Sequence, residues 1–109
     1  MTVSPPPDRL PPEVGRLVIA LCGDYDRRES ILRRAAADPE VLAYFEHLNR
    51  GIDRAMAAVC EEGIRTQLRR DIGLRRGARR SPIYCIGEGT YKRRKRASQY
   101  RIAKELKLL

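Results

Sequence analysis

Apolar residues recur along most of this chain at the spacing of helices rather than of strands. From Glu13 onward, one apolar stripe repeats at helical intervals and predicts an amphipathic helix that runs to about residue 35. Its members are Val14, Leu17, Val18, Leu21, Tyr25 and Leu32. Gly23 weakens this helix but is not expected to stop it. The charged residues between 24 and 34 mix both signs, which indicates a solvated helix face with ion pairs.

A second helix is predicted to begin at Asp38-Pro39-Glu40. Asp can cap a helix, Pro suits the first turn, and Glu favours the positive end of the helix dipole. Its apolar stripe contains Val41, Phe45, Leu48, Ile52, Met56 and Val59. The helical pattern continues toward Ile72, with an interruption expected at Gly63. Because the connection between the two stripes is very short, residues 13–63 are expected to form an antiparallel helical hairpin.

The last third of the chain is predicted to be a basic turn followed by one more helix. Two glycines and a proline within residues 73–82 exclude a continuous helix there, and the apolar run 83–86 fits a buried half-turn or short strand. The last helix is expected from Glu88 to about Leu106. On a helical wheel its two faces differ, with Tyr91, Ser98, Ile102, Leu106 and Leu109 together and Arg93, Arg96, Tyr100, Lys104 and Lys107 opposite. The predicted fold class is therefore all-α.

Charge divides the chain into two unlike halves. Residues 1–63 carry 8 Lys/Arg and 11 Asp/Glu, a net charge of −3, whereas residues 64–109 carry 15 and 3, a net charge of +12. This asymmetry is typical of a scaffold joined to a polyanion-binding surface. We therefore expect a flexible, proline-rich lead-in over 1–12, a helical scaffold over 13–63 that is a candidate for dimerisation, and a basic nucleic-acid-binding unit over 64–109.

The densest cationic segment is 92–96, where five basic residues follow one another at the start of the last helix. Like charges at these spacings repel, and a phosphate backbone offsets the repulsion through counterion release. Arginine near a helix start can also reach guanine in the major groove. Duplex DNA is the expected partner. Base contacts are expected from Lys92, Arg93 and Arg96, and Arg94 of the same run is expected to bind DNA as well. The preceding turn is expected to supply phosphate contacts or a groove-inserted arm through Arg75, Arg76, Arg79 and Arg80.

The same residues resemble a known family. The segments 71–77, 81–84, 87–96 and 102–106 look like the C-terminal part of phage-type transcriptional regulators of the ArpU/RinA kind. The resemblance implies a helix-turn-helix similar to region 4 of sigma factors, whose recognition helix opens with Thr-Tyr and a basic run. It adds Thr90 to the candidate DNA-binding residues. It also implies a role in transcription control, of phage or prophage origin, with RNA polymerase as a candidate partner of the hairpin.

Other function classes find little support in the sequence. The cysteines Cys22, Cys60 and Cys85 are odd in number and far apart, and they show no zinc-site spacing with the single histidine, His47. The adjacent carboxylates 61–62 diverge on a helix, so we expect no enzyme, no cofactor and no small-molecule substrate. The start of the chain lacks the pattern of a signal peptide, and no apolar run could span a bilayer. A cytoplasmic protein is therefore expected.

Two alternatives to a DNA-binding regulator stay open. The first is an RNA-binding or ribosome-associated basic protein, which would need exposed aromatic side chains for base stacking. Only Tyr84, Tyr91 and Tyr100 are available for this in the basic half, and the wheel directs Tyr91 inward. The second is a helical protein-interaction module whose basic tail is incidental.

Overall fold

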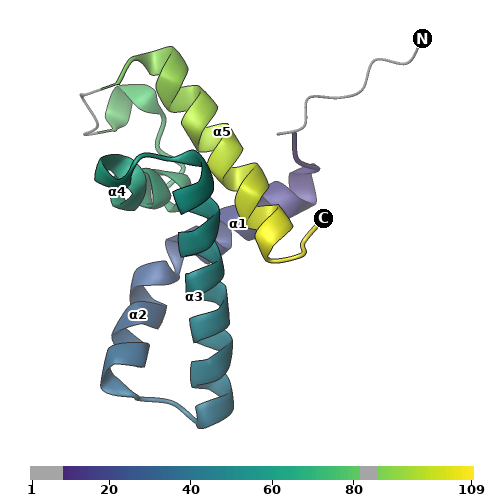
Figure 1. Cartoon of the computed structure of the whole chain (residues 1–109), viewed down its shortest axis with the longest axis vertical. Coiled ribbons are helices and arrows are strands. Elements are labelled where there is room, and N and C mark those ends of the chain that lie inside the picture. Colours follow the sequence, from purple (N-terminus) through teal and green to yellow (C-terminus); the bar gives the residue numbers. More distant parts are fainter. Residues whose placement is uncertain (1–8, 82–85) are drawn as a thin grey trace.

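The computed structural model describes residues 9–81 and 86–109, except for the side chain of Arg80. Within these ranges the chain is all-α and contains no strand, as the periodicity predicts. The elements are α1 (Pro12–Gly23), α2 (Tyr25–Arg34), α3 (Pro39–Val59), α4 (Glu62–Gly73), the 3₁₀ turn η1 (Ala78–Arg80) and α5 (Glu88–Glu105) (Figure 1). Most of the lead-in and most of the apolar run 83–86 lie outside the described residues. None of the helices in the described ranges has the length and apolar character needed to cross a bilayer.

The first long helix predicted from the sequence is in fact two helices. α1 ends at Gly23, and α2 begins after Asp24, whose carbonyl accepts the amide of Arg28. The break coincides with a close crossing of α1 and α4, because a Cβ built on Gly73 would lie 2.6 Å from the Cα of Gly23. Only glycine allows two backbones to approach so closely. The expectation that the helix continues through Gly23 is therefore wrong.

The antiparallel hairpin is consequently shorter than expected. α2 packs against α3, and together they form an arm that projects from the rest of the molecule (Figure 1), while α1 turns away and packs against α4 and α5. The start of α3 follows the sequence prediction, with Asp38 at the N-cap position and Pro39 and Glu40 in the first turn. This helix ends at Val59, and the interruption lies at Cys60 and Glu61. It is not at Gly63, which is inside α4.

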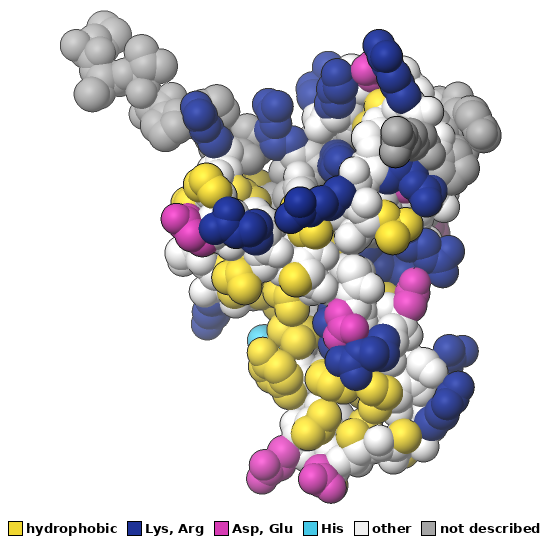
Figure 2. All heavy atoms as spheres, turned by 180° about the vertical axis from the view of Figure 1, so that it is seen from behind, with side chains coloured by type: hydrophobic (Ala, Val, Ile, Leu, Met, Phe, Trp, Pro, Cys, Tyr) yellow, Lys and Arg dark blue, Asp and Glu magenta, His cyan; other side chains and the backbone are white. Residues whose placement is uncertain are grey.

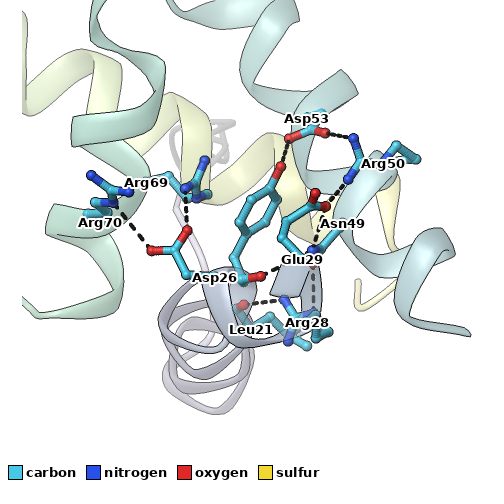
Figure 3. Close-up of polar contacts among 10 residues, drawn as sticks. Leu21, Asp26, Arg28, Glu29, Asn49, Arg50, Asp53, Arg69 and Arg70 are labelled. Atoms are coloured by element: carbon cyan, nitrogen blue, oxygen red, sulfur yellow. Dashed lines mark hydrogen bonds and ion pairs between the residues drawn. The ribbon is translucent and has the colours of Figure 1, made fainter. Parts of the chain in front are cut away.

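A buried polar network joins α2 to α3 (Figure 3). Arg28 is 2% exposed, and its Nε donates to the Oδ1 of Asn49 at 2.7 Å, while its Nη2 donates to the carbonyl of Leu21. The Nδ2 of Asn49 donates to the Oε1 of Glu29 at 2.9 Å and to the carbonyl of Tyr25 at 3.2 Å. Burial lowers the pKa of Arg28. The interpretation of residues 24–34 as a solvated face therefore holds for exposed Arg27 but is wrong for Arg28.

One apolar core joins the acidic and basic halves of the sequence. α5 lies along α3, and α1 crosses α4 and α5 (Figure 1). The buried residues form a single cluster that draws on all five α-helices, with Val18 and Cys22 from α1, Tyr25 from α2, Ile52 and Met56 from α3, Leu68 and Ile72 from α4, and Tyr91 and Ile102 from α5. Two helices alone bury little apolar surface, so a hairpin needs a third element packed against it. α5 is this third element over the C-terminal half of α3.

Candidate nucleic-acid interface

The last helix has the two faces that its sequence predicts. α5 begins after Gly87, which takes the N-cap position without a side-chain hydrogen bond, and its first turn carries Glu88. Tyr91, Ser98 and Ile102 are buried against the core. The basic side chains that lie exposed on this helix are Lys92, Arg93, Arg96, Arg101 and Lys104, followed by Lys107 just beyond it. Leu109, which the wheel places with the inner face, is exposed instead, since it lies past the end of the helix.

The run of five basic residues is divided between two roles. Arg94 makes a two-pronged ion pair with Glu61, whose Oε1 lies 2.9 Å from its Nε and 2.7 Å from its Nη2. This hydrogen bonding raises the pKa of Arg94 and lowers that of Glu61. Lys95 turns toward the preceding segment, where its Nζ donates to the carbonyl of Arg76 at 3.0 Å. Lys92, Arg93 and Arg96 are the three members that point outward.

The basic turn after α4 is held in place by hydrogen bonds that involve a buried carboxylate. Asp71 is fully buried and accepts hydrogen bonds from Gln67 at 2.9 Å and from the hydroxyl of Tyr91 at 2.8 Å. Its carbonyl accepts the amide of Arg76 at 2.8 Å, and the Tyr91 hydroxyl is 3.2 Å from the Arg76 carbonyl. Arg75 adopts the left-handed region with φ 56°. The backbone of residues 74–76 is therefore tied to α4 and α5.

The remaining candidates lie around the start of α5. Arg79 is exposed on η1 and lines a hollow of about 110 Å³ with Ala78, Ile86, Glu88 and Tyr91. The hydroxyl of Thr90 accepts a hydrogen bond from the Nη2 of Arg93 at 3.1 Å. Arg80 belongs to η1, and its side chain lies outside the described residues. The structure thus brings the turn and the start of α5 together into one cationic surface.

Carboxylates neutralise only part of this surface. Lys92 forms an exposed ion pair with Glu88 at 3.2 Å, and a guanidinium nitrogen of Arg76 is 3.8 Å from Asp71. In the described part of the chain, Arg75, Arg79 and Arg93 have no carboxylate within ion-pair distance. On the face drawn in Figure 2, most Lys and Arg side chains lie over the upper half of the molecule, and the largest apolar area lies over the lower half. The electrostatic field therefore favours an anionic partner at the end that carries α5.

The sequence predicts the exposed cations of α5 but not the residues that fix the basic turn and the start of this helix in place. Asp71, Gln67 and Glu61 are not distinguishable by sequence from ordinary surface residues of a helix, because their partners lie far along the chain. Lys95 belongs to the basic run, and only its position beside Tyr91 on the wheel separates it from Arg93 and Arg96. The buried, hydrogen-bonded Tyr91 is the one member of this support that the wheel indicated.

Comparison with known proteins gives no family for this chain. No protein family, curated protein or solved structure matches it. Among the described residues, no group of three His, Cys, Asp or Glu side chains is arranged to hold a metal ion. The chemistry of the surface itself is therefore the guide to its function.

Proposed function

We propose that this chain is a DNA-binding transcriptional regulator that contacts duplex DNA through the start of α5 and the basic turn before it. The observation that carries the proposal is that Arg93 is exposed near the start of α5, that Arg75 and Arg79 are exposed on the turn held against this helix, and that none of the three has a carboxylate partner in the described ranges. Phosphates favour such a site because they meet both the positive side chains and the free backbone N–H groups of the first turn. The resemblance of residues 87–96 to phage-type regulators supports a role in transcription control, of phage or prophage origin.

The division of contacts follows from the geometry. The turn is held to the body of the protein through Asp71 and Tyr91, so Arg75, Arg76 and Arg79 are suited to hold backbone phosphates in a fixed register. Arg93 and Arg96 project from the N-terminal half of α5, the part of a recognition helix that reaches base edges. Thr90 lies in the first turn of α5 and Lys92 at the start of the second. Arg94 supports the helix through Glu61 rather than binding DNA directly.

Two other anionic partners fit this surface less well. Single-stranded RNA is recognised largely by stacking on exposed aromatic rings. Tyr91 is 2% exposed and therefore cannot stack on a base, which leaves half-buried Tyr100 as the one aromatic side chain on the outer face of α5. An anionic membrane would need an apolar helix face free to insert. The apolar face of α5 is already packed against α1 and α3.

A competition experiment tests the proposed partner. The full chain is mixed with a labelled random-sequence duplex, and unlabelled duplex DNA or single-stranded RNA of equal length is added. Duplex DNA should compete more strongly, and repeated selection from a random duplex pool should enrich a preferred site. Stronger competition by RNA would assign the surface to RNA, and failure of both to bind would leave a protein-interaction module.

The arm formed by α2 and α3 supports a second contact, with another copy of the chain. Val41 and Tyr44 lie near its tip and are 39% and 58% exposed. They belong to the part of α3 that precedes Gly51, the residue against which Leu106, just after α5, packs closely. Pairing of two arms would complete a four-helix layer and give a symmetric DNA-binding dimer in the cytoplasm. Light scattering should show a mass of two chains, and Tyr44→Glu should return it to one. If the variant is still a dimer, the self-contact lies elsewhere on the surface. If the wild-type chain is a monomer, the arm is available to another partner such as RNA polymerase.

A further inference from the structure

The cationic face of α5 does not end with the basic run. Lys104 lies in the last turn of the helix and Lys107 just after it, and both are exposed. At 100° per residue Lys104 falls on the same outer face as Arg93 and Tyr100, and Lys107 follows just beyond the end of the helix, where its φ is 57°. In the described part of the chain, neither lysine has a carboxylate within ion-pair distance. No acidic residue occurs between positions 93 and 104, so the face stays positive along its whole length.

The length of this face is large compared with the groove that α5 is proposed to enter. Lys104 lies eleven positions after Arg93, and at 1.5 Å per residue this is about 16 Å along the helix axis. The major groove is about 12 Å wide. When the start of α5 reaches the base edges, Lys104 therefore lies outside the groove, at the level of the sugar-phosphate backbone.

We propose that Lys104 and Lys107 bind a second set of DNA backbone phosphates, separate from those held by the turn at Arg75 and Arg79. The proposal rests on the binding of duplex DNA proposed above. The turn contacts α5 near its start, through Tyr91 and Lys95, whereas the two lysines lie at its other end. α5 then spans the groove with phosphate contacts at both ends, and Tyr100 lies between them. Two anchored ends fix the tilt of the helix, which a single basic run at its start would leave free.

The salt dependence of DNA binding tests this arrangement. Each phosphate contact contributes about 0.9 to the slope of log K against log salt concentration for duplex DNA. The variant Lys104→Gln together with Lys107→Gln should therefore lower the slope by about 1.8 and weaken binding to preferred and random duplexes alike. A matched control is Arg33→Gln together with Arg34→Gln, which removes two exposed charges from the last turn of α2 on the distant arm. Its slope should equal that of the wild type.

The outcomes separate this inference from the function on which it depends. A slope reduced in the lysine variant and unchanged in the arginine control supports the second set of phosphates. Equal slopes in the wild type and the lysine variant overturn it while leaving duplex binding intact. An equal reduction in both variants also overturns it, because the effect would then be one of net charge. A wild-type chain that binds no duplex would remove the proposed function and this inference together. Circular dichroism of both variants shows whether each keeps its helices.

Discussion

The hydroxyl of Tyr91 donates to the Oδ2 of Asp71 across 2.8 Å, and both side chains are buried. This bond joins the start of α5 to the end of α4 directly beneath the basic turn. The same hydroxyl lies 3.2 Å from the carbonyl of Arg76, so one phenol links the helix, the carboxylate and the turn. The position of the proposed phosphate-binding residues therefore depends on a residue that touches no DNA.

Removing that hydroxyl should loosen the turn without unfolding the protein. Tyr91→Phe keeps the ring in the core but leaves the Asp71 carboxylate with one hydrogen bond fewer. A buried hydrogen bond to a charged group contributes about 1.5–3 kcal/mol, so thermal or urea unfolding should show a loss of that order. Affinity for duplex DNA should also fall. The control is Thr66→Val, which removes the hydroxyl of an exposed residue of α4 and should leave both quantities unchanged. Wild-type behaviour of Tyr91→Phe would contradict the supporting role of the bond.

Two buried phenols should also make the fold sensitive to alkali. Burial, followed by the hydrogen bond to a carboxylate, raises the pKa of Tyr91 from 10.0 to about 12, and Tyr25 shows the same shift with Asp53 as its partner. A raised pKa in the folded state stabilises the protein fully below the unfolded value of 10.0, and this contribution is lost as the pH rises toward 12. The free energy of unfolding should therefore fall between these two values.

Urea unfolding at a series of alkaline pH values measures this loss. The double variant Tyr25→Phe with Tyr91→Phe has no such phenols and should lose less stability per pH unit than the wild type over the same range. The comparison removes the part of the pH dependence that comes from the lysines, which both proteins share. Parallel curves for the two proteins would show that the phenols do not contribute.

The crossing of α1 and α4 predicts opposite effects for two glycines of the same helix. Alanine at position 73 would place its Cβ 2.6 Å from the Cα and 2.7 Å from the amide nitrogen of Gly23, and neither backbone atom can move aside cheaply. Gly73→Ala should therefore destabilise the fold by about 1–3 kcal/mol, as overpacking does. A Cβ added to Gly63 would meet no neighbouring group within 4 Å in the described part of the chain, so Gly63→Ala should be neutral or add up to about 1 kcal/mol. Unfolding midpoints of the two variants test the sign of each change.

This crossing also shows why the sequence predicts the helices better than their breaks. The spacing of Val41, Leu48 and Ile52 is enough to identify α3, because a helix face needs only local periodicity. The end of α1 depends on Gly73, fifty residues later, whose backbone passes against Gly23. An isolated glycine is tolerated in most helices, so no local signal distinguishes this one. Tertiary contact decides the position of the break and with it the direction of α1.

The same limit applies to the candidate interface. The wheel separates outward Arg93 and Arg96 from inward Tyr91 because that division depends only on position along α5. It cannot show that Arg94 is paired with Glu61, 33 residues away, or that the turn is tied down by Asp71. Charge along a sequence therefore predicts the sign of the surface, while the partners of each charge decide which side chains are available to a ligand.

The last prediction separates base recognition from charge attraction. Arg93 projects from the first two turns of α5, the region that enters the major groove, whereas Arg75 and Arg79 belong to the preceding turn. Arg93→Gln should cost about 1–3 kcal/mol on a site selected from random duplexes and much less on random DNA. Arg75→Gln together with Arg79→Gln should weaken both kinds of DNA alike and lower the salt slope by about two units.

Binding isotherms on selected and random duplexes, each at several salt concentrations, measure both effects in one series. Arg93→Gln removes one charge, so its salt slope should change by no more than the contribution of one phosphate contact. If all these substitutions weaken selected and random DNA equally, α5 acts as an electrostatic clamp. The chain would then be a nonspecific DNA-binding protein rather than a regulator, because a uniform loss means that no side chain of this surface distinguishes one base pair from another.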